Sequence, residues 1–233
     1  MSEQQRTVLP VTAAWPDPPE LVDDPERARQ AALLDVAVSY LVAHPRASLA
    51  QIAAAADIGR TTLFKLFATR DELEQAVALR AMTVCQAAVD TARRTARDDG
   101  DTDGGLRALV TALLPVGPQL NFVWRTRSPD VDDDVSRAQE ALWHSLGDAL
   151  GAARRAGVLR EVSTWWLEQV LLATVYIAWE SVQGGRLARL DATDLVLDTL
   201  FTGIGGAAGP HPAGATLASI PAPPLPFPDR RSR

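Results

Sequence analysis

The sequence predicts an all-α protein of about nine helices, and three observations support that fold class. A chain of 233 residues, 47% of them hydrophobic, is long and apolar enough to bury a substantial core. Apolar residues recur at helical spacing through most of residues 26–205, and no segment alternates convincingly between apolar and polar residues as a strand would. The prolines inside this stretch lie where helices are expected to end, namely at Pro45, Pro115, Pro118 and Pro129.

Both ends of the chain differ in composition from this helical part. Residues 1–25 and 206–233 contain repeated prolines with little periodicity. Such segments bury too little surface to offset the entropy lost on ordering. We therefore expect a disordered N-terminal tail over 1–25 and a Pro-rich disordered C-terminal tail over 206–233, for which a recruitment role stays open.

The first helix is followed by two short, closely spaced helices. Helical periodicity begins at Glu26 and ends before Pro45. Ser48 then caps a second helix, and a third follows over about 60–66 after a tight turn. Asp57 stands where this turn requires a left-handed backbone, which Asp tolerates better than most residues with a side chain. We expect these elements to share a small apolar core of Ile52, Ala53, Ala56, Ile58, Leu63 and Phe67.

Six further helices follow, of which the fourth of the chain is a long one. Thr69 caps a fourth helix that runs to about Arg97, and a linker over 98–105 ends it. Asp191 or Thr193 is the expected cap of the last helix. The helices in between and at the end are expected over 105–114, 118–126, 132–156, 163–184 and 191–205.

The charge is distributed unevenly along the chain. There are 23 Lys and Arg residues against 29 Asp and Glu residues, and the net charge of −6 argues against a chain that is basic throughout. Residues 26–70 alone carry six basic and three acidic residues, a net charge of +3, which leaves −9 for the remainder. The only lysine of the sequence, Lys65, lies in this basic segment. A basic segment of this kind suits contact with phosphates.

Residues 48–73 carry many residue types at fixed spacing. The pattern consists of Ile52-Ala53, Ala55-Ala56, Asp57-Ile58-Gly59, Thr62-Leu63-Phe64-Lys65, Phe67, Thr69-Arg70 and Asp71-Glu72-Leu73. It resembles the DNA-binding domain of the TetR/AcrR family of transcriptional regulators, and the similarity extends over about 26–75. The resemblance implies a three-helix helix-turn-helix DNA-binding domain over 26–72 and a helical ligand-binding and dimerisation domain over 73–205.

The third helix is expected to present its N-terminal residues to the major groove, as recognition helices do. The DNA-binding residues expected on this basis are Arg46, Ser48, Arg60, Thr61, Thr62, Phe64, Lys65, Thr69 and Arg70. The sequence departs from the family's pattern at Asp57, which replaces the turn glycine, and at Gly59, which replaces a capping serine. Phe64 replaces a tyrosine whose hydroxyl commonly meets a phosphate in relatives, and Leu66 replaces a frequent polar residue. Both of these changes weaken the expected phosphate contacts.

The family resemblance places the dimer interface on the last two long helices, and both have wide apolar faces. The expected interface residues are Leu167, Val170, Leu171, Thr174, Ala178, Leu197, Leu200 and Phe201. The alternative, that both are ordinary core helices, stays open.

Aromatic residues are frequent in the same domain, and ligand pockets in helical bundles are mostly apolar and aromatic. The expected pocket residues are Met82, Cys85, Phe122, Trp124, Trp143, His144, Tyr176 and Trp179. Aromatic residues at helical spacing also form plain cores. His144 alternatively satisfies a backbone carbonyl, and Cys85 is either a redox sensor or inert packing.

Neither acidic cluster of the sequence predicts a metal site. Residues 99–104 begin like a calcium-binding EF-hand loop, but Val110 stands where the loop needs a bidentate Glu. Residues 130–134 are acidic at an expected helix start, where negative charge is favourable. No cofactor is expected, and the sequence shows no nucleophile elbow, phosphate-binding glycine loop or paired-histidine metal motif, so we do not expect an enzyme.

A single cysteine requires no oxidising compartment, and residues 1–25 lack the pattern of a signal peptide. The longest apolar stretch, over 170–179, is about half of what a bilayer requires. We therefore expect a cytoplasmic protein without a membrane segment.

These observations predict a ligand-responsive repressor. It would bind a palindromic operator in double-stranded DNA as a homodimer and be released by a small apolar or aromatic effector. The alternative is a small-molecule-binding helical dimer with weakened or lost DNA recognition, to which Asp57, Phe64 and Leu66 point.

Overall fold

The computed structural model describes residues 25–100, 105–125 and 133–204, and these residues form nine α-helices and one short 3-10 helix, with no strand among them. The helices are α1 (Pro25–Ala43), α2 (Leu49–Ala55), α3 (Arg60–Leu66), α4 (Arg70–Asp99), α5 (Leu106–Leu113), the 3-10 helix η1 (Leu114–Val116), α6 (Gly117–Arg125), α7 (Asp133–Arg155), α8 (Thr164–Gln183) and α9 (Arg189–Ile204). The all-α prediction is confirmed. The expected tails lie outside the described residues, except that Pro25 is the first residue of α1, where proline is well tolerated.

The two caps expected at Ser48 and Thr69 are present, and Ser163 provides a third. The Oγ atom of Ser48 accepts from the backbone N–H of Gln51 at 3.3 Å, and the Gln51 side chain accepts in return from the Ser48 backbone N–H at 2.8 Å. The Thr69 hydroxyl accepts from the N–H of Glu72 at 3.1 Å. Ser163 caps α8 in the same manner. Each cap satisfies an N–H group that the first turn of a helix otherwise leaves without an acceptor.

Two element boundaries differ from the prediction. The last helix begins at Arg189, so neither Asp191 nor Thr193 caps it; Asp191 lies in its first turn, where a carboxylate still favours the helix dipole. The expected break between the fifth and sixth helices is a single 3-10 turn, in which Pro115 occupies a position that needs no N–H donor.

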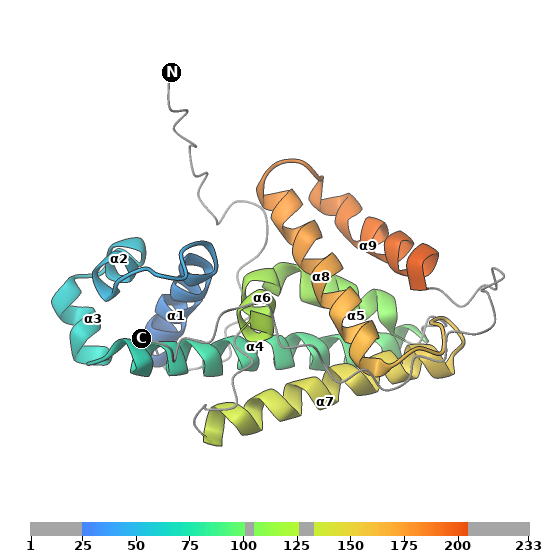
Figure 1. Cartoon of the computed structure of the whole chain (residues 1–233), viewed down its shortest axis with the longest axis horizontal. Coiled ribbons are helices and arrows are strands. Elements are labelled where there is room, and N and C mark those ends of the chain that lie inside the picture. The colour runs from blue at the N-terminus through green and yellow to red at the C-terminus, as the bar shows by residue number, and fades with distance from the viewer. Residues whose placement is uncertain (1–24, 101–104, 126–132, 205–233) are drawn as a thin grey trace, which may run out of the picture.

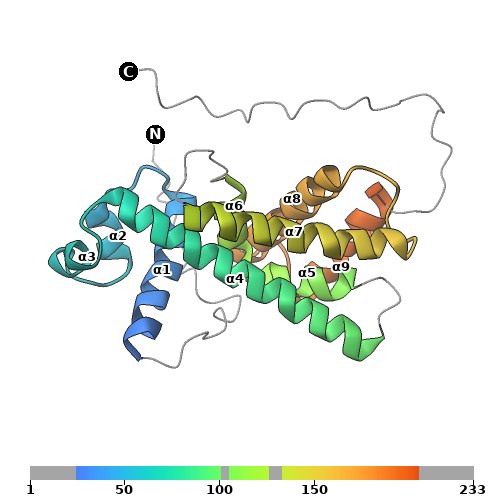
Figure 2. The same ribbon diagram turned by 90° about the horizontal axis from the view of Figure 1, so that it is seen from below.

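Helices α1 to α3 form one end of the molecule, and α4 extends from them along most of its length (Figure 1). Figure 2 shows α7 crossing beside α4, and the two helices are in contact. On the other side of the bundle, α8 packs on α6, α7 and α9. The buried residues form one cluster that runs from Leu33 in α1 to Leu200 in α9, so α4 belongs to the core at both ends.

The stretch Leu106–Arg125 covers α5, η1 and α6 and is by length and composition apolar enough to cross a membrane, with a mean hydropathy of 1.2. This stretch is longer than residues 170–179, which the sequence indicates as the longest apolar stretch. Of its most apolar window, 67% is buried inside the fold. Its packing against α1, α4 and α8 therefore accounts for its apolar character.

Candidate nucleic-acid interface

The turn between α2 and α3 has the geometry that the sequence predicts. Asp57 has a φ angle of 53° and is the one residue with a side chain in the left-handed region among those the structure describes. The N–H of Ile58 donates to the carbonyl of Ala53 at 3.0 Å and closes the turn. Gly59 then serves as the N-cap of α3 without a side-chain hydrogen bond. The short turn fixes the direction in which α3 leaves α2.

Helix α3 buries one side and exposes the other. Leu63 and the adjoining Phe67 are buried in the same core as Ile52 and Ala53 of α2, as predicted. Ala56 and Ile58, also expected in this core, are partly buried against it. The exposed residues of α3 are Arg60, Thr61, Thr62, Phe64, Lys65 and Leu66. A helix that exposes its first turn beside a short supporting helix has the arrangement that inserts into a major groove.

Arg60 and Phe64 interact on this exposed face. The Arg60 guanidinium carbon lies 5.2 Å from the centre of the Phe64 ring, within the range of an attractive cation–π contact. Phe64 is 38% exposed and Leu66 is 42% exposed. The ring has no hydroxyl to offer a phosphate, but it supports the guanidinium at the start of α3, the part of a recognition helix that contacts base edges in helix-turn-helix proteins.

The remaining predicted DNA contacts surround α3. Arg46, Ser48 and Thr69 are exposed. The hydroxyl groups of Ser48 and Thr69 are already engaged as helix caps. Because a hydroxyl oxygen has two lone pairs and one donor, a cap leaves limited capacity for a phosphate.

Arg70 is half-buried and binds within the chain. Its Nε atom donates to Glu74 at 2.7 Å, its Nη2 atom donates to the carbonyl of Pro45 at 3.0 Å, and its Nη1 atom donates to the carbonyl of Ala47. Arg70 therefore ties the start of α4 to the loop between α1 and α2. Its donors are directed into the protein, unlike those of the exposed Lys65.

A buried ion pair that the sequence reasoning missed joins this end to the rest of the molecule. Asp35 of α1 accepts from Arg80 of α4 with Nη2–Oδ2 and Nε–Oδ1 distances of 2.7 and 3.1 Å. Gln119 of α6 lies 3.5 Å from the same carboxylate. The sequence signal that could have revealed this pair is the acidic Asp35 next to Leu34, on the apolar side of the first helix.

The predicted ligand-pocket residues differ in burial, and none of them lines either of the two cavities described below. Met82 and Cys85 are buried in the core, and His144 is 82% exposed beside Asp148. The partly buried aromatic residues are Phe122, Trp124, Trp143, Tyr176 and Trp179. Two of them, Tyr176 and Trp179, stack with ring centres 5.8 Å apart. A cavity of about 510 Å³ lies elsewhere, between α4, α5 and α7, and none of the eight residues lines it.

Burial affects the hydrogen bonding and the pKa values of several predicted pocket residues. The Trp124 Nε1 atom donates to Gln169 of α8 at 2.8 Å. Burial raises the pKa of the Cys85 thiol far above its ordinary value, so the residue is a neutral packing group. Burial and the neighbouring Glu180 raise the pKa of Tyr176, with Arg125 opposing them.

The predicted interface residues of α8 and α9 fall into two groups. Five of them are buried within the chain's own core, namely Leu167, Leu171, Ala178, Leu197 and Leu200. Three are partly exposed, namely Val170, Thr174 and Phe201. The exposed apolar side chains on these helices are Trp165, Trp166, Ile177, Leu190 and Leu195. A groove of about 290 Å³ between α8 and α9 is lined by Thr174, Ala178 and the exposed Ile177 and Leu195, among others.

In the part of the chain that the structure describes, no group of three or more His, Cys, Asp or Glu residues is placed to hold a metal ion. Asp101, Asp103, Asp130 and Asp132 of the two acidic clusters lie outside that part.

Comparisons with known proteins agree with this geometry. The chain is 31% identical over 182 residues to the HTH-type transcriptional repressor LfrR of Mycolicibacterium smegmatis, which covers 77% of this chain and 91% of that protein. The crystal structure of LfrR in complex with proflavine matches 77% of this chain and 98% of its own with a TM-score of 0.62 and 29% identity. A TetR family transcription regulator from Marinobacter aquaeolei has the same fold, with a TM-score of 0.58, 19% identity, and coverage of 78% of this chain and 97% of its own.

No family model matches the sequence. The similarity to LfrR nevertheless covers 77% of this chain and 91% of that protein at 31% identity. The chain belongs to the TetR/AcrR family of helix-turn-helix transcriptional regulators.

Proposed function

We propose that this regulator is a homodimeric repressor that binds a palindromic operator in double-stranded DNA. A small molecule with an apolar or aromatic body binds the segment 73–205 and thereby releases the repressor from the operator. The observation that carries the proposal is the exposed face of α3, which presents Arg60, Thr61, Thr62 and Lys65 beside a supporting helix. Such a protein acts in the cytoplasm and has no catalytic role.

The chemistry of the side chains indicates which of them contact bases and which contact phosphates. Arg60 at the start of α3 has the forked guanidinium that suits the O6 and N7 atoms of guanine, and Thr61 and Thr62 offer methyl and hydroxyl groups to base edges. Lys65 and Arg46 are exposed cations that suit phosphates. Arg70 serves the fold instead, by holding the loop before α2 against α4.

The exposed apolar side chains of α8 and α9 support the dimer. Ile177 is 60% exposed and Leu195 is 50% exposed on the two sides of the α8–α9 groove. Trp166 at the start of α8 adds a further large apolar surface. Together with the partly exposed Val170 and Thr174, these residues form the surface that a second copy would cover. A two-fold axis there would separate the two α3 helices by about one DNA turn, ~34–36 Å.

Effector release requires that the small molecule bind one conformation more tightly than the other. Helix α4 is suited to carry the difference, since it packs on α1 at one end and on α5 and α7 further along. The LfrR structure contains proflavine, which supports binding of a small molecule with an aromatic body by this chain.

One observation favours the alternative, a small-molecule-binding helical dimer with weakened DNA recognition. Phe64 and Leu66 place two apolar side chains on the face that would meet phosphates. Neither side chain can donate a hydrogen bond to a phosphate oxygen. The cation–π contact of Phe64 with Arg60 argues for recognition, because it keeps a base-reading group in place.

An electrophoretic mobility shift assay with the DNA flanking the protein's own gene distinguishes the two functions. The repressor binds a palindrome in that DNA with an affinity that falls steeply as salt is raised. A protein that forms dimers but shifts no flanking palindrome even at low salt is the alternative. The R60M variant is the matched test of recognition, since it removes the base-reading group and leaves the fold of α3 intact.

A further inference from the structure

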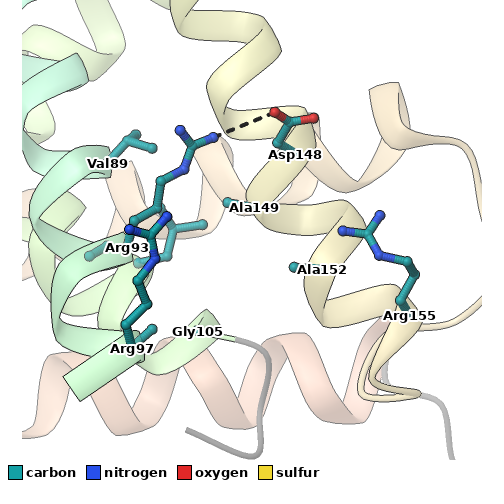
Figure 3. A pocket seen from close by; sticks show the side chains of 11 residues that line it. Val89, Arg93, Arg97, Gly105, Asp148, Ala149, Ala152 and Arg155 are labelled. Carbon is teal, nitrogen blue, oxygen red and sulfur yellow. Dashed lines mark ion pairs between the residues drawn. The ribbon is translucent and has the colours of Figure 1, made fainter. Parts of the chain in front are cut away.

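The cavity of about 510 Å³ is formed by the C-terminal half of α4, the start of α5 and the C-terminal half of α7 (Figure 3). Its size is that of a small-molecule site. Part of its wall is apolar and made of small or aliphatic side chains, namely Val89, Ala92, Ala96, Leu109, Ala149 and Ala152. The cavity exists because alanines stand where α4 and α7 face each other and larger side chains would fill the space.

Three arginines line the same cavity, Arg93 and Arg97 from α4 and Arg155 from α7, as Figure 3 shows. Among the described residues that line the cavity, Asp148 is the one carboxylate. It lies 3.7 Å from the Nη2 atom of Arg93, which also donates to the carbonyl of Ser145 at 2.9 Å. Arg93 is therefore already paired.

Arg97 and Arg155 have no carboxylate partner among the residues that the structure describes. Both side chains are exposed, and their two guanidinium groups line one cavity with partly apolar walls. They raise the electrostatic potential at the cavity, against the negative charge of the neighbouring Asp98. A guanidinium group presents its donors in a planar fork that matches a carboxylate or a phosphate.

The N-terminal end of α5 also favours a negatively charged ligand in the cavity. Gly105 lines the cavity and is the N-cap of α5, with a φ angle of 83° and no side-chain cap hydrogen bond. The first-turn N–H groups of α5 therefore have no capping side chain as acceptor. The N-terminal end of a helix attracts negative charge. The arginines and the helix end favour the same kind of ligand.

We propose that this cavity is the effector site and that it takes a small organic anion. Arg97 and Arg155 bind its carboxylate or phosphate group, and its aliphatic or single-ring body packs on the alanines and Leu109. The binding of the anion stands on the cavity alone; its regulatory consequence rests on the proposed function. Helix α4 links the two, since its 30 residues run from the α3 end to this cavity over about 45 Å.

The test is isothermal titration calorimetry on the full chain. The probes are benzoate, octanoate and phenyl phosphate, with benzamide and octanamide as neutral counterparts and inorganic phosphate as the bare anion. At least one organic anion is expected to bind tenfold or more tightly than its neutral counterpart and than inorganic phosphate. The ranking of the carboxylates against phenyl phosphate identifies the anionic group.

R97M and R155M are each expected to weaken that binding at least tenfold. R94M is the matched control, because Arg94 is a neighbour of Arg97 on α4 that does not line the cavity. Circular dichroism establishes that the variants are folded. Equal affinity for the anion and its amide, or unchanged affinity in R97M and R155M, overturns the site. The arginines then only interact favourably with the negative C-terminal ends of the α4 and α7 helix dipoles.

Operator binding is measured separately by mobility shift, with and without the anion. Anion binding that depends on Arg97 and Arg155, with no operator found, upholds the site and refutes the repressor function. Operator binding that the bound anion leaves unchanged overturns the assignment of this cavity as the effector site.

Discussion

The ion pair between Arg80 of α4 and Asp35 of α1 gives a quantitative prediction for the R80M variant. The two side chains are 10% and 16% exposed, and two of the guanidinium nitrogens contact the carboxylate. Removing Arg80 leaves a nearly buried carboxylate with Gln119 as its remaining neighbour, at 3.5 Å. Breaking a buried pair costs about 3–5 kcal/mol, and since both groups keep some exposure, we expect a loss of about 3 kcal/mol in the free energy of unfolding.

The matched control is the pair of Arg107 and Asp194, which joins α5 to α9. Its Nη1–Oδ1 distance is also 2.7 Å, but its side chains are 54% and 67% exposed. Solvent screens such a pair, so D194N is expected to lose less than about 1 kcal/mol. D35N makes the same change in the pair with Arg80, so the difference between D35N and D194N isolates burial as the cause.

The assay is urea unfolding followed by tryptophan fluorescence, at one fixed protomer concentration because a dimer gains stability from association. D35N and the double variant D35N/R80M complete a double-mutant cycle and give the coupling energy between the two residues. A loss below about 1 kcal/mol in R80M, or a coupling energy near zero, refutes the reasoning that this pair secures α1 on α4.

Three further predictions concern DNA contact, packing and pH. K65A should weaken binding about equally for all operator variants and lower the slope of log affinity against log salt by about one per protomer, as salt titrations measure; a loss confined to certain operators contradicts a phosphate contact. G117A should destabilise the fold by about 2 kcal/mol in urea unfolding, because its Cβ would lie 2.4 Å from Cγ of Trp179, whereas G147A, with no atom nearer than 3.4 Å, should gain about 1 kcal/mol; equal effects contradict the packing. The raised pKa of Cys85 keeps the folded thiol protonated while the unfolded thiol ionises, so stability above pH 9.0 should fall relative to C85A by up to about 1.4 kcal/mol per pH unit; parallel pH profiles contradict this.

The local elements of the fold could be predicted because their signals are local. Ser48 and Thr69 cap the helices that follow them, and Asp57 takes the left-handed turn, since each needs only neighbouring residues. The start of α9 was missed because Asp191 suits both an N-cap and a first-turn position.

Helical periodicity marks an apolar face but does not say what covers it. On α8, Leu171 is buried in the chain's own core while Val170 is partly exposed, although both belong to one predicted interface. The division depends on where α6, α7 and α9 pack, which is not encoded in the sequence of α8 alone.

The cavity escaped prediction for a related reason. Large aromatic residues such as Trp124 and Trp179 indicated a pocket; in the structure Trp124 donates to Gln169 and Trp179 stacks on Tyr176. The space lies beside Ala92, Ala96 and Ala152, where side chains are too small to fill it. Alanines and arginines on facing helices were the usable signal.

The central claim is that the exposed face of α3 binds a palindrome as part of a dimer. Fluorescence anisotropy with a palindrome selected from the DNA flanking the gene, and with one half-site of it, tests this claim most directly. We predict two protomers bound per palindrome, far weaker binding to the half-site, and affinity that falls steeply between 50 and 200 mM salt, a range over which phosphate contacts cost roughly 10³–10⁵ in affinity. Equal binding to palindrome and half-site, or binding that salt leaves unchanged, contradicts the claim.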